Sequence, residues 1–227
     1  MRHPATLVAP ADEMPLFAWK RFLDIVLGGL LLIVLSPLLA LIALAIWVDT
    51  PGPALYLQDR VGRHAVPFRM LKFRTMHVNS DDASHRRAAA AWFAGQPTEH
   101  GYKDVRDPRV TRSGRLLRAL SLDELPQLVN VVRGDMSLVG PRPGIAYELE
   151  HYADWHFKRL QVRPGITGLW QVMGRDRLPA EQMMRLDCRY VERCSLALDL
   201  KILALTIPTV LGMRRPQGAR MDRAGLP

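Results

Sequence analysis

The segment from Ile25 to Val48 decides how this chain folds; it reads IVLGGLLLIVLSPLLALIALAIWV and contains no charged residue. Its 24 residues exceed the roughly 20 that a helix needs to cross a bilayer. The segment is too long and too uniformly apolar for an ordinary core helix. It also begins too far from the N-terminus, and lacks the small-residue cleavage site, for a signal peptide. We therefore expect a membrane element over residues 18–50.

Ser36 and Pro37 interrupt this segment near its middle. Proline removes one helix hydrogen bond and clashes with the preceding turn. Two geometries remain open: a kinked helix that spans the membrane, or a re-entrant helix–break–helix that returns to the side it came from. Lys20 and Arg21 precede the segment and several cations follow it. Because positive charge marks cytoplasmic flanks, cations at both ends favour the re-entrant hairpin.

A second apolar stripe occurs near the C-terminus, where Leu200, Leu203, Ile207 and Leu211 recur at helical spacing. Such a stripe suits an amphipathic helix lying in the lipid interface. It suits a helix packed on a protein core equally well. The sequence leaves both interpretations open.

Charge and cysteine content narrow the classes of partner. The net charge is +9, and 26 of the 31 basic residues are Arg. Such a balance indicates an anionic partner: an acidic membrane surface, a phosphate-rich substrate or a nucleic acid. The sequence shows no zinc-finger, RNP or helix-turn-helix signal, which argues against a nucleic acid. Its two cysteines, Cys188 and Cys194, form no disulfide framework and agree with a reducing compartment.

Candidate catalytic residues occur in two neighbouring stretches, SLDELPQL from Ser121 and GDMSLVGPRP ending at Pro143. Asp123 and Glu124 are adjacent, and adjacent carboxylates need a cation, a metal or a shared proton to sit together. Arginines near them suit a phosphorylated substrate, because the guanidinium fork matches phosphate oxygens. The pattern therefore predicts phosphoryl chemistry.

A structural interpretation of the same stretch is a capping box, in which Glu124 reaches back to the amide of Ser121 at a helix start. Pro126 fits that interpretation poorly, because its missing N–H would be needed inside the helix. A helix that begins nearer Leu125 suits Pro126 better and leaves both carboxylates at its positive end.

The chain as a whole resembles the bacterial sugar transferase family, the monotopic polyprenyl-phosphate sugar-1-phosphate transferases. The resemblance covers about residues 18–213 and keeps its blocks in order. Ala65 departs from it, because members often have Gly there. Besides the two stretches above, the blocks are KRFLD from Lys20, GP at Gly52 with Gln58, Arg60 and Gly62, KFRTM from Lys72, DPRVT from Asp107, RPGITGLWQ from Arg163 with Gly174-Arg175, and LDLKIL from Leu198.

The resemblance implies an enzyme that moves a sugar 1-phosphate from a UDP-sugar to undecaprenyl phosphate and so initiates exopolysaccharide, O-antigen or glycan assembly. It implies that Asp123 is a nucleophile that forms a covalent phospho-sugar intermediate and releases UMP, as carboxylates can at phosphorus. Glu124 would assist, and both carboxylates would bind Mg²⁺, which takes one or two carboxylates together with substrate phosphates.

Three arginines are expected to bind substrate. Arg118 and Arg175 match family positions that contact substrate. Arg142 lies between two prolines, whose stiffness pre-organises a phosphate ligand; a rigid surface turn is the alternative.

Three further candidates have open alternatives. Lys72 and Arg74 share one strand face by their spacing of two and suit a lipid phosphate or a structural ion pair. Gln171 is expected to bind a nucleobase or sugar beside Trp170, although a core position is the commoner finding for Trp.

We expect an α+β fold: a re-entrant hairpin over 18–50, a cytoplasmic catalytic domain over 51–213 with interfacial amphipathic helices and a small sheet, and flexible tails over 1–17 and 214–227. Short strands are predicted over 54–58, 66–73 and 166–172. Helices are predicted over 81–93, 114–119, 125–132, 143–160 and 179–191, with a last helix capped by Ser195.

Partners follow from this interpretation: a UDP-sugar, undecaprenyl phosphate and the lipid of the bacterial inner membrane, with a homodimer left open and no nucleic acid. The competing hypothesis is a non-catalytic basic scaffold that docks polysaccharide-synthesis enzymes at the membrane. A scaffold would tolerate loss of Asp123 and Glu124, whereas an enzyme would not.

Overall fold

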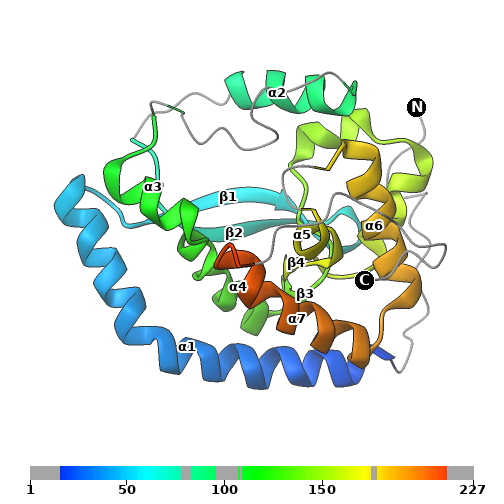
Figure 1. Ribbon diagram of the computed structural model, residues 1–227, viewed down its shortest axis with the longest axis horizontal. Coiled ribbons are helices and arrows are strands. Elements are labelled where there is room, and N and C mark those ends of the chain that lie inside the picture. Colours follow the sequence, from blue (N-terminus) through cyan, green and yellow to red (C-terminus); the bar gives the residue numbers. More distant parts are fainter. Residues whose placement is uncertain (1–15, 78–82, 96–106, 108, 175–177, 214–227) are drawn as a thin grey trace.

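The computed structural model describes residues 16–77, 83–95, 107, 109–174 and 178–213. The predicted tails therefore lie outside the described residues, apart from 16 and 17. A long helix, α1, runs along one side of two small sheets, and shorter helices cover the rest (Figure 1). The mixed helix-and-sheet class confirms the α+β prediction.

Helix α1 extends over Leu16–Asp49 and begins two residues before the predicted start. Within the described part of the chain, its segment Ala18–Asp49 is the one helix long and apolar enough to cross a membrane, and 11% of its most apolar window is buried. A core helix would be mostly buried, so this helix is compatible with membrane association. Its 34 residues would measure about 50 Å if straight, against a hydrocarbon core of about 30 Å.

The expected break takes the form of a bend inside one continuous helix, and Figure 1 shows the two limbs of α1 running in different directions. Pro37 has no N–H to donate to the carbonyl of Ile33, four residues before it. The hydroxyl of Ser36 donates to that carbonyl instead, at 2.8 Å. The Ser-Pro pair thus bends the helix without leaving a polar group unsatisfied in apolar surroundings.

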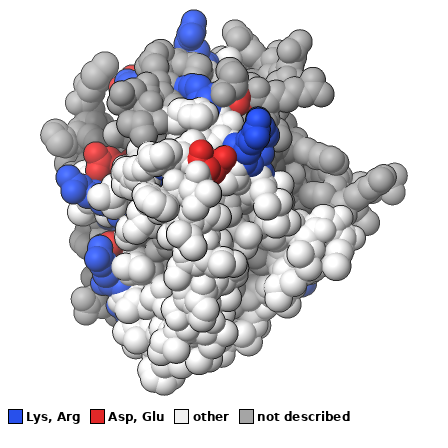
Figure 2. Space-filling model, turned by 90° about the vertical axis from the view of Figure 1, so that its left-hand side faces the viewer, with Lys and Arg blue, Asp and Glu red and all other residues white. Residues whose placement is uncertain are grey.

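One side of α1 packs on the rest of the protein. Ile42 and Ile46 are buried against Phe73 and Leu117, and Gly28 in the first limb lies against Val131. The opposite side exposes large apolar side chains, and the lower part of the face in Figure 2, where α1 lies, is largely uncharged. The exposed residues of α1 include Phe22, Ile25, Val26, Leu30, Ile33, Val34, Leu41, Leu44, Trp47 and Val48.

Two small sheets lie on the inner side of α1 (Figure 1). Strands β1 (Leu55–Val61) and β2 (Pro67–Phe73) pair antiparallel, with Leu55 opposite Phe73. Strands β3 (Ser137–Val139) and β4 (Gly165–Thr167) pair in parallel. The turn between β1 and β2 is the 3-10 helix η2 (Arg63–Ala65).

Ala65 in this turn has a φ of 61°, in the left-handed region that favours glycine. The chain therefore keeps the left-handed backbone at the position where family members often have Gly.

Strand β3 was not predicted from the sequence. The other predicted helices and strands agree with the structure except in two places. The segment predicted as a helix over 143–160 forms two 3-10 helices, and the strand predicted over 166–172 ends at Thr167 and becomes a helix after Gly168. The other bounds are α2 Ala83–Phe93, α3 Arg112–Ala119, η3 Leu122–Glu124, α4 Gln127–Arg133, η4 Ala146–His151, η5 Asp154–Gln161, α5 Leu169–Met173, α6 Ala180–Arg193 and α7 Leu196–Val210.

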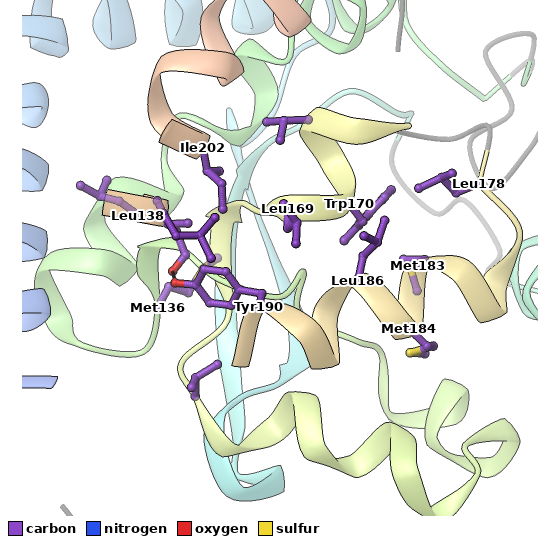
Figure 3. Close-up of a cluster of buried hydrophobic side chains, with 14 of the residues drawn as sticks. Met136, Leu138, Leu169, Trp170, Leu178, Met183, Met184, Leu186, Tyr190 and Ile202 are labelled. Carbon is purple, nitrogen blue, oxygen red and sulfur yellow. Dashed lines mark hydrogen bonds between the residues drawn. The ribbon is translucent and has the colours of Figure 1, made fainter. Parts of the chain in front are cut away.

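The main core lies between α5, α6, α7 and the β3–β4 sheet (Figure 3). Tyr190 and Met184 of α6, Leu169 of α5 and Ile202 of α7 are almost fully buried there. Trp170 belongs to the same cluster with 5% exposure, so the core interpretation of this residue is confirmed.

Helix α7 is apolar on two sides. Leu198 and Ile202 enter the core, whereas Leu200, Ile207 and Leu211 are exposed. Three of the four residues in the predicted stripe therefore face outward, which favours an interfacial helix over a purely core-facing one. Ser195 caps the helix as predicted, accepting a hydrogen bond from the amide of Leu198.

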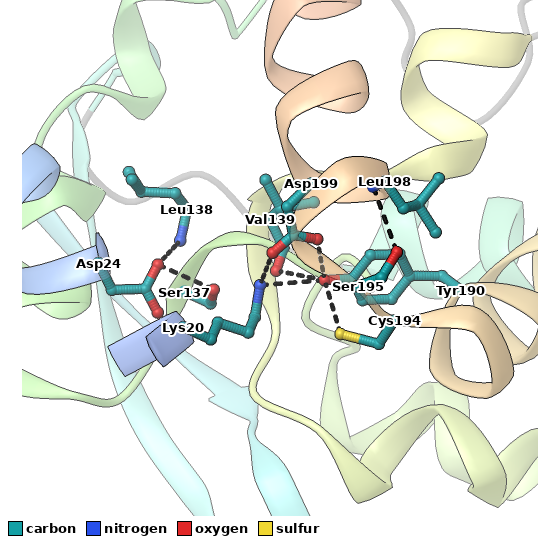
Figure 4. A network of polar contacts seen from close by, with 10 residues as sticks. All are labelled: Lys20, Asp24, Ser137, Leu138, Val139, Tyr190, Cys194, Ser195, Leu198 and Asp199. Carbon is teal, nitrogen blue, oxygen red and sulfur yellow. Dashed lines mark hydrogen bonds and ion pairs between the residues drawn. The ribbon is translucent and has the colours of Figure 1, made fainter. Parts of the chain in front are cut away.

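A buried polar network joins the start of α1 to the core (Figure 4). The ammonium of Lys20 forms an ion pair with Asp199 of α7 and donates to the hydroxyl of Tyr190 at 3.0 Å. Asp24, one turn later, accepts hydrogen bonds from the Ser137 hydroxyl and the Leu138 amide of β3. The first limb of α1 is thus bonded to α6, α7 and β3.

We expect Lys20→Met to lower the free energy of unfolding by about 3 kcal/mol, because it leaves the buried carboxylate of Asp199 without its cation. Urea titration in detergent micelles would measure this. Arg185→Met is the control, since Arg185 pairs with Glu181 at the exposed surface and is expected to cost under about 1 kcal/mol. Equal effects of the two substitutions would contradict the prediction.

Candidate active site

The adjacent carboxylates lie on η3, a single turn between α3 and α4, and both are buried with 7% exposure. The capping-box interpretation of this stretch was wrong. The side chain of Ser121 does not cap the turn, and α4 begins at Gln127, directly after Pro126. Ser121 instead has a φ of 55°, so a left-handed residue redirects the chain just before Asp123.

Glu124 lies between two cations from distant parts of the chain. The Nη2 atom of Arg142 is 3.0 Å from its Oε1 atom, and the Nζ atom of Lys72 is 3.8 Å from the same oxygen. Lys72 comes from β2 and Arg142 from the loop after β3. The fold therefore brings three of the predicted site residues together, with side chains that are 9–14% exposed.

Arg118 is the predicted cation beside Asp123. Its Nε atom donates to the hydroxyl of Thr75 at 2.9 Å. Burial lowers the pKa of Arg118, and the charges of Asp123 and Asp107 oppose that effect. The Arg118 guanidinium thus interacts electrostatically with Asp123 and is held by its hydrogen bond to Thr75.

Asp107 and Arg109 form a pair next to this site that the sequence did not single out as functional. Arg109 donates to both carboxylate oxygens of Asp107 at 2.6–3.0 Å, and these hydrogen bonds lower the pKa of Asp107. Arg109 therefore makes the hydrogen bonds to Asp107, and the charge of Arg118 acts on both Asp107 and Asp123.

The loop from Gly140 to Gly144, which carries Arg142, fits closely against neighbouring backbone. A Cβ added to Gly140 would lie 2.5 Å from the carbonyl oxygen of Arg163 and 2.9 Å from the amide of Gly165. The amide of Gly140 donates to Thr167 at 2.9 Å. The glycine at 140 is thus required by close approach, and it brings the loop onto β4.

Gln171 and Arg74 both make contacts within the fold. Gln171 lies on α5, half-buried, and donates to the carbonyl of Ile166 at 3.2 Å. The guanidinium of Arg74 donates to the backbone carbonyl of Thr50 and, at 3.0 Å, to its hydroxyl, just past the end of α1. This contact gives Arg74 a structural role at the end of α1, while its substrate role stays a prediction. Arg175 lies outside the described residues.

The donor set suits one small hard cation shared with a substrate. Among the described residues, no group of three or more His, Cys, Asp and Glu side chains lies close enough to hold a metal. Mg²⁺ needs only one or two carboxylates when phosphate oxygens complete its shell. Asp123 fits this role, whereas Glu124 is already compensated by Arg142 and Lys72.

Comparison with protein families shows which family has these sequence blocks. The model of the bacterial sugar transferase family matches residues 16–213. This chain belongs to that family. The match begins with the first described residue of α1 and ends after α7, so it includes the apolar helix α1, the carboxylates and the Arg142 loop.

Three relatives have informative names. A Caulobacter vibrioides protein named UDP-glucose:undecaprenyl-phosphate glucose-1-phosphate transferase is 44% identical over 200 residues, covering 85% of this chain and 69% of the relative. A Salmonella typhimurium undecaprenyl-phosphate galactose phosphotransferase is 44% identical over 85% of this chain but only 40% of its own length. A Sinorhizobium fredii exopolysaccharide production protein is 42% identical over 84% of both chains.

We expect the backbone of Ser121 to constrain this site. Ser121→Gly should be at least as stable as the unaltered protein, because glycine adopts a left-handed conformation without steric cost. Ser121→Val should lose about 1–2 kcal/mol, because a β-branched residue is strained there. Urea titration in detergent would measure both, with Ser121→Ala to separate the hydroxyl from the backbone. Equal stability of the Gly and Val variants would contradict this account.

Proposed function

We propose that this protein transfers a sugar 1-phosphate from a UDP-sugar to undecaprenyl phosphate and releases UMP. The observation that carries the proposal is the buried Asp123-Glu124 pair, with Arg118 beside one carboxylate and Arg142 and Lys72 beside the other. Relatives named for this reaction share more than 40% identity with the chain.

In the first step, a carboxylate oxygen of Asp123 attacks the phosphorus that bears the sugar. A bond forms between that oxygen and phosphorus, and the phosphorus–oxygen bond to UMP breaks, so UMP leaves with the electron pair. The product is an acyl phosphate that carries the sugar on Asp123. Burial keeps water away from this mixed anhydride, which would otherwise hydrolyse.

In the second step, a phosphate oxygen of undecaprenyl phosphate attacks the same phosphorus. The bond to Asp123 breaks, the carboxylate is restored, and the lipid leaves as a diphospho-sugar. Only a nucleophile that both substrates can reach in turn can serve this sequence, which suits one carboxylate at the membrane surface.

The neighbouring cations hold the phosphates. Arg118 faces Asp123 and stabilises negative charge that develops on the attacked phosphorus. Arg142 and Lys72 fix Glu124 and offer positive charge to the second phosphate. If Mg²⁺ binds here, Asp123 would hold it, with Glu124 as a second carboxylate that also keeps its contacts with Arg142 and Lys72, and the ion would neutralise charge between carboxylate and diphosphate. Arg175 and Gln171 remain proposed contacts for the donor.

The membrane geometry we propose is the re-entrant one. Lys20 and Asp24 attach the first limb of α1 to the folded domain. At the other end, Asp49 accepts hydrogen bonds from Ser113 of α3, and Arg74 donates to Thr50. A helix that crossed the bilayer would have its ends on opposite sides, so attachment of both ends to one domain supports a hairpin that returns.

We place the catalytic domain at the cytoplasmic face of the bacterial inner membrane, where soluble UDP-sugars meet the lipid carrier. Free Cys188 and Cys194 suit that reducing side. The relative named for exopolysaccharide production supports a place at the start of polysaccharide assembly. The homodimer stays a prediction.

We expect Asp123→Asn to reduce UMP release by at least a thousandfold, because an amide cannot form the acyl phosphate. The assay uses protein in lipid nanodiscs with undecaprenyl phosphate, Mg²⁺ and UDP-glucose, UDP-galactose or N-acetylated UDP-hexoses.

Asp59→Asn serves as the control, since Asp59 is an exposed carboxylate on β1. Turnover by Asp123→Asn equal to that of the unaltered protein would refute the proposal. Activity that survives removal of both carboxylates, or membrane docking without any turnover, would favour the scaffold.

A further inference from the structure

We infer that Arg159, held by Asp187 and Tyr152, is a positioning residue that sets the direction of Arg142 toward Glu124. The inference rests on the proposed function, because it assigns a role to a residue behind the proposed site. Neither Arg159 nor Asp187 was singled out from the sequence.

Arg159 makes four hydrogen bonds and is deeply buried. Its Nε and Nη2 atoms donate to Oδ2 of Asp187 at 2.9 and 2.7 Å, and Nη1 donates to the hydroxyl of Tyr152 at 2.5 Å. Its Nη2 atom also donates to the backbone carbonyl of Arg142 at 2.5 Å. The side chains of Arg159 and Asp187 are 2% and 0% exposed.

The loop around Arg142 depends on donors from outside itself. Pro141 and Pro143 have no N–H, so the loop has few donors of its own. Four consecutive carbonyls nevertheless have partners from other segments. The carbonyl of Pro141 accepts from the Gly165 amide at 2.8 Å, and that of Gly144 accepts from the Val61 amide at 2.9 Å. Between them, the carbonyl of Arg142 accepts from the Arg159 guanidinium at 2.5 Å, and that of Pro143 accepts from the Arg60 guanidinium at 3.0 Å.

Among these four donors, Arg159 binds the peptide unit of the functional residue itself. A change at Arg159 therefore rotates or releases the backbone from which the Arg142 side chain extends, 3.0 Å from Glu124. Buried ion pairs are often replaceable by apolar residues without loss of stability. A role of the Arg159–Asp187 pair in orienting the Arg142 side chain thus explains the pair better than a contribution to stability alone.

The chain supplies a matched control for this pair. Lys158, the preceding residue on η5, pairs with Glu192 on the same helix α6 at 2.7 Å. That pair joins the same two elements but is 42% and 52% exposed. A change at Lys158 perturbs the packing of η5 on α6 without touching the loop.

The test is a double-mutant cycle on UMP release in nanodiscs. Arg159→Lys keeps the charge but cannot donate to all three partners at once, and we expect kcat to fall about tenfold to a hundredfold with KM within about twofold. In an Arg142→Ala background, the same substitution should cost less than about twofold, because the residue it positions is gone. Lys158→Ala should leave kcat unchanged.

Equal losses from Arg159→Lys with and without Arg142 would show a merely structural role and overturn the inference. If Arg159→Lys does not fold, Tyr152→Phe removes one hydrogen bond of Arg159 and should show the same non-additivity with a smaller loss.

Hydrogen exchange separates this inference from the proposed function. Exchange of the peptide over residues 137–145 should accelerate at least about threefold in Arg159→Lys and stay unchanged in Lys158→Ala, because the first variant releases the loop. Unchanged exchange in Arg159→Lys would overturn the inference, whether or not UMP is released. Absence of Asp123-dependent UMP release would instead refute the proposed function and leave the exchange result standing.

Discussion

The rest of the structure depends on the fastening of α1 at both of its ends. The Lys20–Asp199 ion pair and the Asp24 hydrogen bonds hold the first limb, and the contacts of Asp49 and Arg74 hold the second. Between these points the helix exposes large apolar side chains. The domain therefore holds an exposed apolar segment on both sides of its bend, an arrangement that is compatible with membrane association.

The same contacts order the interior near the candidate site. Ser137, Leu138 and Val139 of β3 each bond to a residue of this network: the first two to Asp24, and the carbonyl of Val139 to the Tyr190 hydroxyl. Strand β3 leads directly into the loop of Arg142. The position of α1 and the position of Arg142 are thus set by one continuous run of backbone.

The sequence predicted the features that depend on local composition. The long apolar helix, the cap at Ser195 and the strands β1 and β2 follow from residue type and spacing. It mispredicted 166–172 as a strand, because the turn at Gly168 depends on close packing against Gly140. It missed Arg159 and Asp187 because sequence alone does not distinguish a buried charged residue from a surface one; their burial depends on how distant segments pack.

The loop of Arg142 also has a consequence for the order of events during folding. Its carbonyls take their donors from β1, β4 and η5, and Arg60 lies 83 residues before Pro143. Contacts so distant in sequence form only after the intervening chain has been assembled. We therefore expect this loop to be among the last parts of the chain to become ordered. A newly made chain would not position Arg142 until β1, β4 and η5 had packed around the loop.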